Sequence, residues 1–175
     1  MNPMRVGDVF ATASPKGPSK AIRAIEKFWS KDGEAEYSHT GIVADSYGET
    51  FEALWTGYGD GNLFDDYYRT KIIIVRYMGF AGMLPFSALQ QLRNKYKGRK
   101  YPYWRLLMHV FPPLAKISLA KMPVCSELTA LNAHMIGARG PTWAGVTPDM
   151  LVDEWRKWRD FLVVFEGRLC DYVTA

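Results

Sequence analysis

The sequence predicts an α+β fold in which an antiparallel sheet packs against helices. Strand-like runs come as a block near the start of the chain, at Val6–Thr12, Ser38–Asp45, Glu49–Trp55 and Lys71–Tyr77. They do not alternate regularly with helices, and the later part of the chain is mainly helical in pattern. A last strand is expected at Phe161–Phe165. Such segregation is typical of α+β proteins with antiparallel sheets.

The length and composition indicate one globular domain. The 175 residues are 48% hydrophobic and 23% charged, and no linker divides them, so we expect a single domain over residues 1–175. No run of about 20 apolar residues is present that would span a membrane. The N-terminal segment lacks the apolar core of a secretory signal. We therefore expect a cytoplasmic protein, and action at the cell envelope stays open.

The block of strands contains a hairpin signal. Ser38–Asp45 and Glu49–Trp55 are both rich in β-forming residues, and the turn residues Ser46–Gly48 separate them. The glycine-rich stretch Gly57–Gly61 is interpreted as a loop, and Lys71–Tyr77 as the next strand.

Start and stop signals predict the helices. They are expected at Ser19–Ser30, Pro85–Tyr96, Cys125–Ile136 and from Pro148 onwards. Gly98 and Gly137 end the second and third of these. Thr147 is a suitable N-cap for the last helix, which begins with proline at its first position.

Cys125 is the candidate nucleophile. It follows Pro123-Val124 and begins a predicted helix, whose free N–H groups and positive dipole end would stabilise a thiolate and could form an oxyanion hole. A buried structural cysteine is the alternative that position alone leaves open. Cys170 has no such setting and is interpreted as structural, and two cysteines do not indicate a disulfide framework.

Among the three histidines, elimination favours His39 as the general base. His134 follows Cys125 on the same predicted helix, about half a turn out of phase and roughly 13 Å away along the axis. His109 lies in an aromatic, proline-bounded segment and is interpreted as a packing or surface residue. His39 begins the strand HTGIVAD, where a strand end can present its side chain to a helix terminus.

Glu52 is the candidate third group, which would orient the imidazole. A two- or four-residue hairpin loop would place Glu52 on the same sheet face as His39, and the four-residue loop would place it opposite Gly41, diagonal to His39. A three-residue loop would turn Glu52 to the other face. A solvated strand charge is the alternative.

Neither a metal nor another cofactor is expected, because the sequence has no HExxH motif, no CxxC pair and no carboxylates at metal-ligand spacing. Basic and aromatic residues interleave over Arg93–Arg105 in a chain of net charge +4. This stretch could bind an anionic surface, or it is a solvated helix end. No nucleic-acid-binding motif accompanies it, so we expect no nucleic acid partner.

Seven segments carry a family pattern. They are GDVFAT (7–12), YSHTGIV (37–43), FEALWTG (51–57), VRY (75–77), GRKYPYW (98–104), PVCSELTALN (123–132) and VTPDML (146–151). In this order, which extends over most of the chain, they resemble the circularly permuted NlpC-type papain-like cysteine hydrolases, and in particular the YiiX-like branch. The order of histidine before cysteine agrees with the permuted group.

The resemblance implies a permuted papain-like fold, with the histidine on the sheet and the cysteine on a helix. It also implies that Cys125 is the nucleophile, His39 the base and Glu52 the acidic residue that holds the imidazole.

Four further residues are candidates for contact with substrate. A tyrosine before the cysteine often lines such sites, and Tyr101 or Tyr103 matches it, although the usual Tyr-Asp pair is Tyr-Pro-Tyr in this chain. Ser38 and Ser126, which adjoin the base and the nucleophile, complete the set.

The implied activity is hydrolysis of an amide bond through an acyl-enzyme, for instance in the peptides of the bacterial cell wall. Two alternatives stay open. One is a lipid-directed acyltransferase, thioesterase or lipase similar to lecithin-retinol acyltransferase. The basic, aromatic and apolar stretch Trp104–Lys121 could lie on a membrane surface, which supports this alternative, or could be a lid that packs over the cleft. The other is a binding module without catalysis on the same scaffold.

Overall fold

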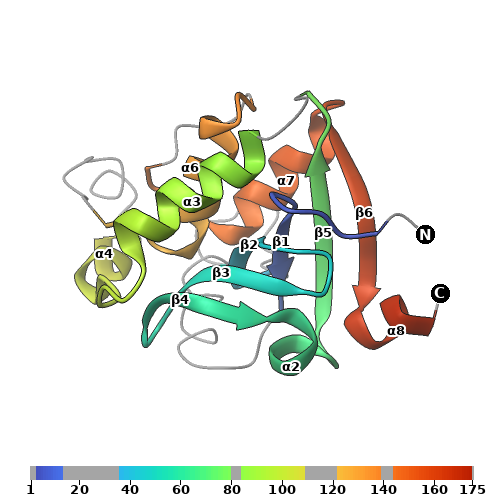
Figure 1. Cartoon of the computed structure of the whole chain (residues 1–175), viewed down its shortest axis with the longest axis horizontal. Coiled ribbons are helices and arrows are strands. Elements are labelled where there is room, and N and C mark those ends of the chain that lie inside the picture. Colours follow the sequence, from blue (N-terminus) through green and yellow to red (C-terminus); the bar gives the residue numbers. More distant parts are fainter. Residues whose placement is uncertain (1–2, 14–35, 80–83, 109–121, 139–143, 175) are drawn as a thin grey trace.

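The computed structural model describes residues 3–13, 36–79, 84–108, 122–138 and 144–174. Over these residues the chain forms a six-stranded sheet with helices packed on both faces (Figure 1). The strands are β1 (Val9–Thr12), β2 (His39–Val43), β3 (Glu49–Leu54), β4 (Gly57–Asn62), β5 (Lys71–Tyr77) and β6 (Phe161–Arg168). The helices are α2 (Leu63–Tyr67), α3 (Leu84–Tyr96), α4 (Tyr103–Met108), α6 (Cys125–Met135), α7 (Pro148–Lys157) and α8 (Leu169–Thr174).

The predicted fold class is confirmed as α+β with an antiparallel sheet. The strands lie in the order β4-β3-β2-β1-β5-β6, and every neighbouring pair is antiparallel. The predicted helix Ser19–Ser30 lies outside the described residues. None of the helices described is long and apolar enough to cross a membrane.

A four-residue turn joins β2 to β3. The Ala44 N–H donates to the Glu49 carbonyl at 2.7 Å, so residues 45–48 form the turn. The Asp45 carboxylate accepts from the N–H groups of Tyr47 and Glu49, both at 2.8 Å, and Gly48 has φ +92°, a conformation that glycine adopts without strain. The hydrogen bonds to Asp45 and the glycine at position 48 therefore determine the length of the turn.

The length of this turn sets the register of the hairpin. Gly41 lies opposite Glu52, as the four-residue alternative predicts. Because side chains alternate along a strand, Glu52 shares the face of His39 and Gly41, whereas Ile42 and Phe51 point to the other face. A shift of one residue would reverse this arrangement.

The two faces of the sheet carry separate apolar cores. On one face α3, α6 and α7 cover the strands, with buried residues such as Leu89, Leu128 and Trp155. On the other face the short helices α2 and α8 cover β1 and β5 through Tyr67 and Leu169 (Figure 1). The sheet is thus buried in its middle, and the end of β2 that bears His39 lies between the two cores.

The predicted loop at Gly57–Gly61 is wrong, because these residues belong to strand β4. Glycines 57, 59 and 61 lie opposite Leu54, Glu52 and Thr50 on β3, while Tyr58 points into the core at 3% exposure. A Cβ on Gly61 would lie 3.0 Å from Glu52 Oε1, so glycine leaves room for that carboxylate. Gly57 and Gly61 mark a close approach by neighbouring groups within a strand.

Gly41→Ala should destabilise the protein by about 1–3 kcal/mol, as overpacking of a filled core does. A Cβ there would lie 2.6 Å from the Phe10 ring and 2.8 Å from Glu52 Cγ. The matched control is Gly59→Ala on β4, where a Cβ has nothing within 4 Å. Urea unfolding of both variants measures the difference, and equal free energies of unfolding would contradict the close packing around Gly41.

Candidate active site

Cys125 lies at the first position of α6, with its thiol buried at 4% exposure. The backbone N–H groups of Thr40 and Ser126 donate to its sulfur. The Thr40 N–H is available because β2 pairs with β3 only from Gly41 to Val43, so Thr40 lies beyond the last pair. The structure thus places the sulfur at a helix N-terminus and at the point where two strands separate.

His39 lies between Cys125 and Glu52. Its Nε2 is 2.6 Å from Glu52 Oε2, and its side chain is 13% exposed. The ring also hydrogen-bonds to the Cys125 thiol, and since Nε2 is taken by Glu52, Nδ1 is the nitrogen that faces the sulfur. The imidazole stacks on the Tyr67 ring, with centroids 6.0 Å apart, and meets the Phe10 ring edge-on at 6.3 Å.

The charges of the Cys125 thiolate and the His39 imidazolium stabilise each other. Burial alone lowers the pKa of His39, but its hydrogen bonds to Cys125 and Glu52 outweigh burial and raise the pKa to about 10. Burial alone raises the pKa of the Cys125 thiol, but the hydrogen bonds from His39, Thr40 and Ser126 lower it below its usual value. The arrangement therefore favours a thiolate–imidazolium pair at neutral pH.

Glu52 is almost completely buried, with 1% of its side chain exposed, and its oxygens have several partners. Oε2 accepts from the Tyr67 hydroxyl at 2.7 Å as well as facing His39, and Oε1 accepts from the Thr50 hydroxyl. Thr50 lies two residues before Glu52 on β3, on the same face. These donors hold the carboxylate in one orientation toward the imidazole.

Of the two candidate tyrosines, Tyr101 reaches Cys125. It is buried, and its hydroxyl oxygen accepts from the Cys125 backbone N–H. Tyr103 is more than half exposed; its hydroxyl donates to the Trp55 carbonyl, and its ring meets the Tyr101 ring edge-on with centroids 5.5 Å apart. At this position the Tyr101 hydroxyl can donate its proton to an oxygen that becomes negative beside Cys125.

The two serines proposed as substrate contacts lie beside the dyad and are both buried. The Ser126 hydroxyl donates to the Val146 carbonyl at 2.7 Å, which directs it away from the sulfur, whereas its backbone N–H faces the sulfur. Ser38 precedes His39, and its N–H donates to the Thr12 carbonyl at 3.0 Å. Contact of Ser38 or Ser126 with a substrate stays a prediction.

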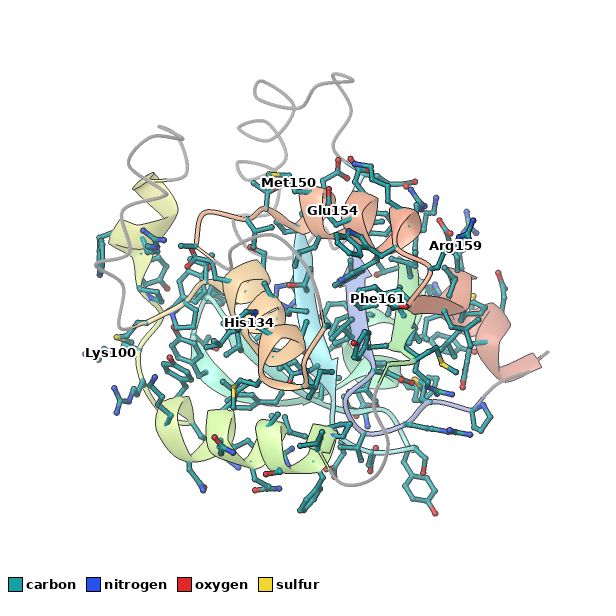
Figure 2. All side chains as sticks on the ribbon, turned by 90° about the horizontal axis from the view of Figure 1, so that it is seen from above. Lys100, His134, Met150, Glu154, Arg159 and Phe161 are labelled. Carbon is teal, nitrogen blue, oxygen red and sulfur yellow. The ribbon has the colours of Figure 1, made fainter. Side chains whose placement is uncertain are left out.

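The other cysteine and histidines do not join this site where the structure describes them. His134 is exposed on α6 (Figure 2), and His109 lies outside the described residues. Cys170 is half-buried in α8, with its sulfur 3.4 Å from Asp171 Oδ1.

A buried ion pair anchors the N-terminus of α6. Glu127 and Arg105 are both 0% exposed, and Arg105 Nη2 lies 2.6 Å from Glu127 Oε1. The same carboxylate accepts from the N–H groups of Val124 at 3.1 Å and of Gly145 at 2.7 Å. Farther along the helix, the Thr129 hydroxyl lies 3.0 Å from that of Thr40. Glu127 thus connects three segments of the chain at the base of the site.

The structure pairs several cations of the basic stretch Arg93–Arg105. Arg93 and Lys97 both form ion pairs with Asp60 on β4, and Arg105 is buried against Glu127. Lys100 stays exposed in the segment between α3 and α4 (Figure 2). An anionic partner for this stretch stays a prediction.

Sequence reasoning missed the groups that hold the candidate residues in place. Tyr67 lies on α2, which returns the chain over the face of His39 after β4. Because Gly57–Gly61 was interpreted as a loop, this return could not be predicted. The alternation of glycine with Tyr58, Asp60 and Asn62 was the signal for β4.

Comparisons with known proteins identify a shared fold. No protein-family model matches the sequence, and no curated protein matches it. Among solved structures, the crystal structure of the metalloprotein YiiX from Escherichia coli O157:H7 matches with a TM-score of 0.61. The two chains are 18% identical, and the match covers 93% of this chain and 97% of that one.

Glu127→Gln should destabilise the protein by about 3–5 kcal/mol, because it leaves Arg105 buried without a counter-charge. The matched control is Glu36→Gln, since Glu36 pairs with Lys71 on the surface and its loss should cost less than about 1 kcal/mol. Denaturant unfolding compares the two variants. Similar free energies of unfolding would show that Glu127 does not anchor α6.

Proposed function

We propose that this protein is a cysteine hydrolase that cleaves an amide bond, with Cys125 as nucleophile, His39 as general base and acid, and Glu52 as the residue that orients the imidazole. One observation carries the proposal: the hydrogen-bonded series from the Cys125 thiol through His39 to Glu52 Oε2, with the sulfur at a helix N-terminus. Nucleophile, base and orienting acid in this sequence are what acyl transfer needs.

In the proposed reaction the Cys125 thiolate attacks the carbonyl carbon and forms a C–S bond, while the carbonyl π electrons move to the oxygen. The Tyr101 hydroxyl, whose oxygen accepts from the Cys125 N–H, donates its proton to this developing oxyanion in the proposal. The C–N bond then breaks, and the His39 imidazolium gives its proton to the leaving amine. Water, deprotonated by His39, attacks the thioester and releases the acid and the thiolate.

A permuted papain-like architecture is part of the proposal. Two features support it: the strand with the histidine precedes the helix with the cysteine, and the sheet and helices match those of YiiX at a TM-score of 0.61. The amide bonds of bacterial cell-wall peptides are the first substrates to test, because the NlpC-type resemblance of the sequence motifs implies them.

The proposal uses no metal. YiiX is described as a metalloprotein, but in the part of the chain that the structure describes no group of three or more His, Cys, Asp or Glu side chains could hold a metal ion. The residues in hand therefore do not fit such a centre, and every step above is assigned to the protein's own side chains.

Trapping the acyl-enzyme tests the proposal. Incubation with p-nitrophenyl acetate should add one acetyl group to Cys125, seen by intact mass and peptide mapping, and Cys170→Ala should leave this labelling unchanged. Cys125→Ala should abolish it, and His39→Ala should slow it by roughly 10²–10⁴-fold. Turnover is then measured on cell-wall peptides. Acetylation that persists in Cys125→Ala, or that maps only to surface amines, would overturn the proposal.

A further inference from the structure

Exposed aromatic side chains lie in the segments next to the candidate site. Trp55, in the turn between β3 and β4, is 57% exposed, and Tyr103, at the start of α4, is 53% exposed. The neighbouring Tyr58 and Tyr96, in contrast, are buried and stacked on each other. Two large rings left in water beside a buried nucleophile require an explanation.

We propose that Trp55, Tyr103 and Tyr101 form an aromatic ledge that binds an apolar group of the substrate whose carbonyl Cys125 attacks. This inference rests on the proposed function and names a specificity determinant for it. The bound group is alkyl or aromatic. Either an acyl chain or an apolar peptide side chain would supply it.

Three successive contacts connect the ledge to the nucleophile. The Tyr103 hydroxyl donates to the Trp55 carbonyl, the Tyr103 ring meets the Tyr101 ring with centroids 5.5 Å apart, and the Tyr101 hydroxyl oxygen accepts from the Cys125 N–H. These contacts run from the surface to the backbone of Cys125, and Trp55 joins them through its backbone carbonyl.

Backbone hydrogen bonds hold the two segments of the ledge side by side. The Tyr58 N–H donates to the Arg99 carbonyl at 3.0 Å, and the Gly98 N–H donates to the Tyr58 carbonyl at 2.9 Å. A Cβ on Gly57 would lie 2.6 Å from the Arg99 carbonyl oxygen, so the segments are in direct contact. Aromatic side chains on such a support lose little conformational entropy when they bind a ligand.

The polar groups of the ledge favour an apolar ligand over a polar or cationic one. Since the Tyr103 hydroxyl is bound to the Trp55 carbonyl, that residue offers its ring rather than its hydroxyl. The segment from Lys97 to Arg105 contains no acidic residue, and Arg99 and Lys100 are exposed there, so its charges repel a cation. Burial of an apolar group is the interaction that the exposed faces of these rings offer.

Alkylation of Cys125 by a matched series of 2-chloroacetamides tests this ledge. The N-substituents are methyl, hexyl and 2-phenylethyl, and each rate is divided by the rate of the same probe with 2-mercaptoethanol. The protein is Cys170→Ala throughout, so that labelling reports Cys125, and the reaction runs at about pH 9, where even an ordinary thiol is largely ionised.

We expect at least one apolar probe to react about ten-fold faster than the methyl probe. Trp55→Ala and Tyr103→Ala should remove most of this gain, and Tyr103→Phe, which keeps the ring, should retain it. Tyr47→Ala is the matched control, because Tyr47 is 80% exposed in the turn at the opposite end of the hairpin. A larger gain for hexyl points to an acyl chain, and one for phenylethyl to an aromatic side chain.

Equal rates for the three probes, or a gain that survives both Trp55→Ala and Tyr103→Ala, would overturn the ledge. The readout needs only alkylation, not hydrolysis. A protein that shows the gain but forms no acyl-enzyme would keep the ledge and lose the proposed function, whereas a hydrolase with no gain would lose the ledge alone.

Discussion

The hydrogen bond between His39 Nε2 and Glu52 Oε2, 2.6 Å long, determines the arrangement of the whole site. It fixes the orientation of the ring and leaves Nδ1 to face the Cys125 sulfur. It exists because the four-residue turn places Glu52 opposite Gly41, where no side chain comes between the two groups. A buried carboxylate is costly without partners, so the bond also depends on the hydroxyl groups of Tyr67 and Thr50. The positive charge of the protonated imidazole in turn stabilises the negative charge of the Cys125 thiolate.

The sulfur side of the site is held in a different way. Glu127 joins the N-terminus of α6 to Arg105 in a buried contact and to Gly145 in a partly buried one. A buried ion pair of this kind contributes little net stability compared with well-packed apolar residues. Its benefit is precise placement, since it fixes the first turn of the helix relative to Arg105 and Gly145. The Thr129 hydroxyl joins the same helix to Thr40 on β2, whose N–H faces the sulfur. Both halves of the site thus rest on buried polar groups with complete sets of partners.

Local patterns in the sequence predicted the elements that bear Cys125, His39 and Glu52. The strand alternation gave two allowed loop lengths that bring Glu52 to the face of His39, and the structure has one of them. The supporting groups could not be predicted, because their contacts depend on long-range packing. Arg105 was interpreted as part of a basic surface, yet it is buried against Glu127, which lies 22 residues away. Tyr67 reaches Glu52 only because α2 crosses the sheet after β4. The strand patterns in the sequence do not show which path the chain takes between two strands.

The central claim is that Cys125 is ionised by its contact with His39, and the pH dependence of its alkylation tests this most directly. In Cys170→Ala protein, the rate of reaction with iodoacetamide should stay nearly constant from below pH 7 to about pH 9. The thiolate is present there because the pKa of Cys125 is lowered and that of His39 is raised to about 10. In His39→Ala the rate should be low at neutral pH and rise only above about pH 8.5, because burial without the imidazolium raises the thiol pKa. A native rate that rises through the usual thiol range, or that His39→Ala leaves unchanged, would contradict the account.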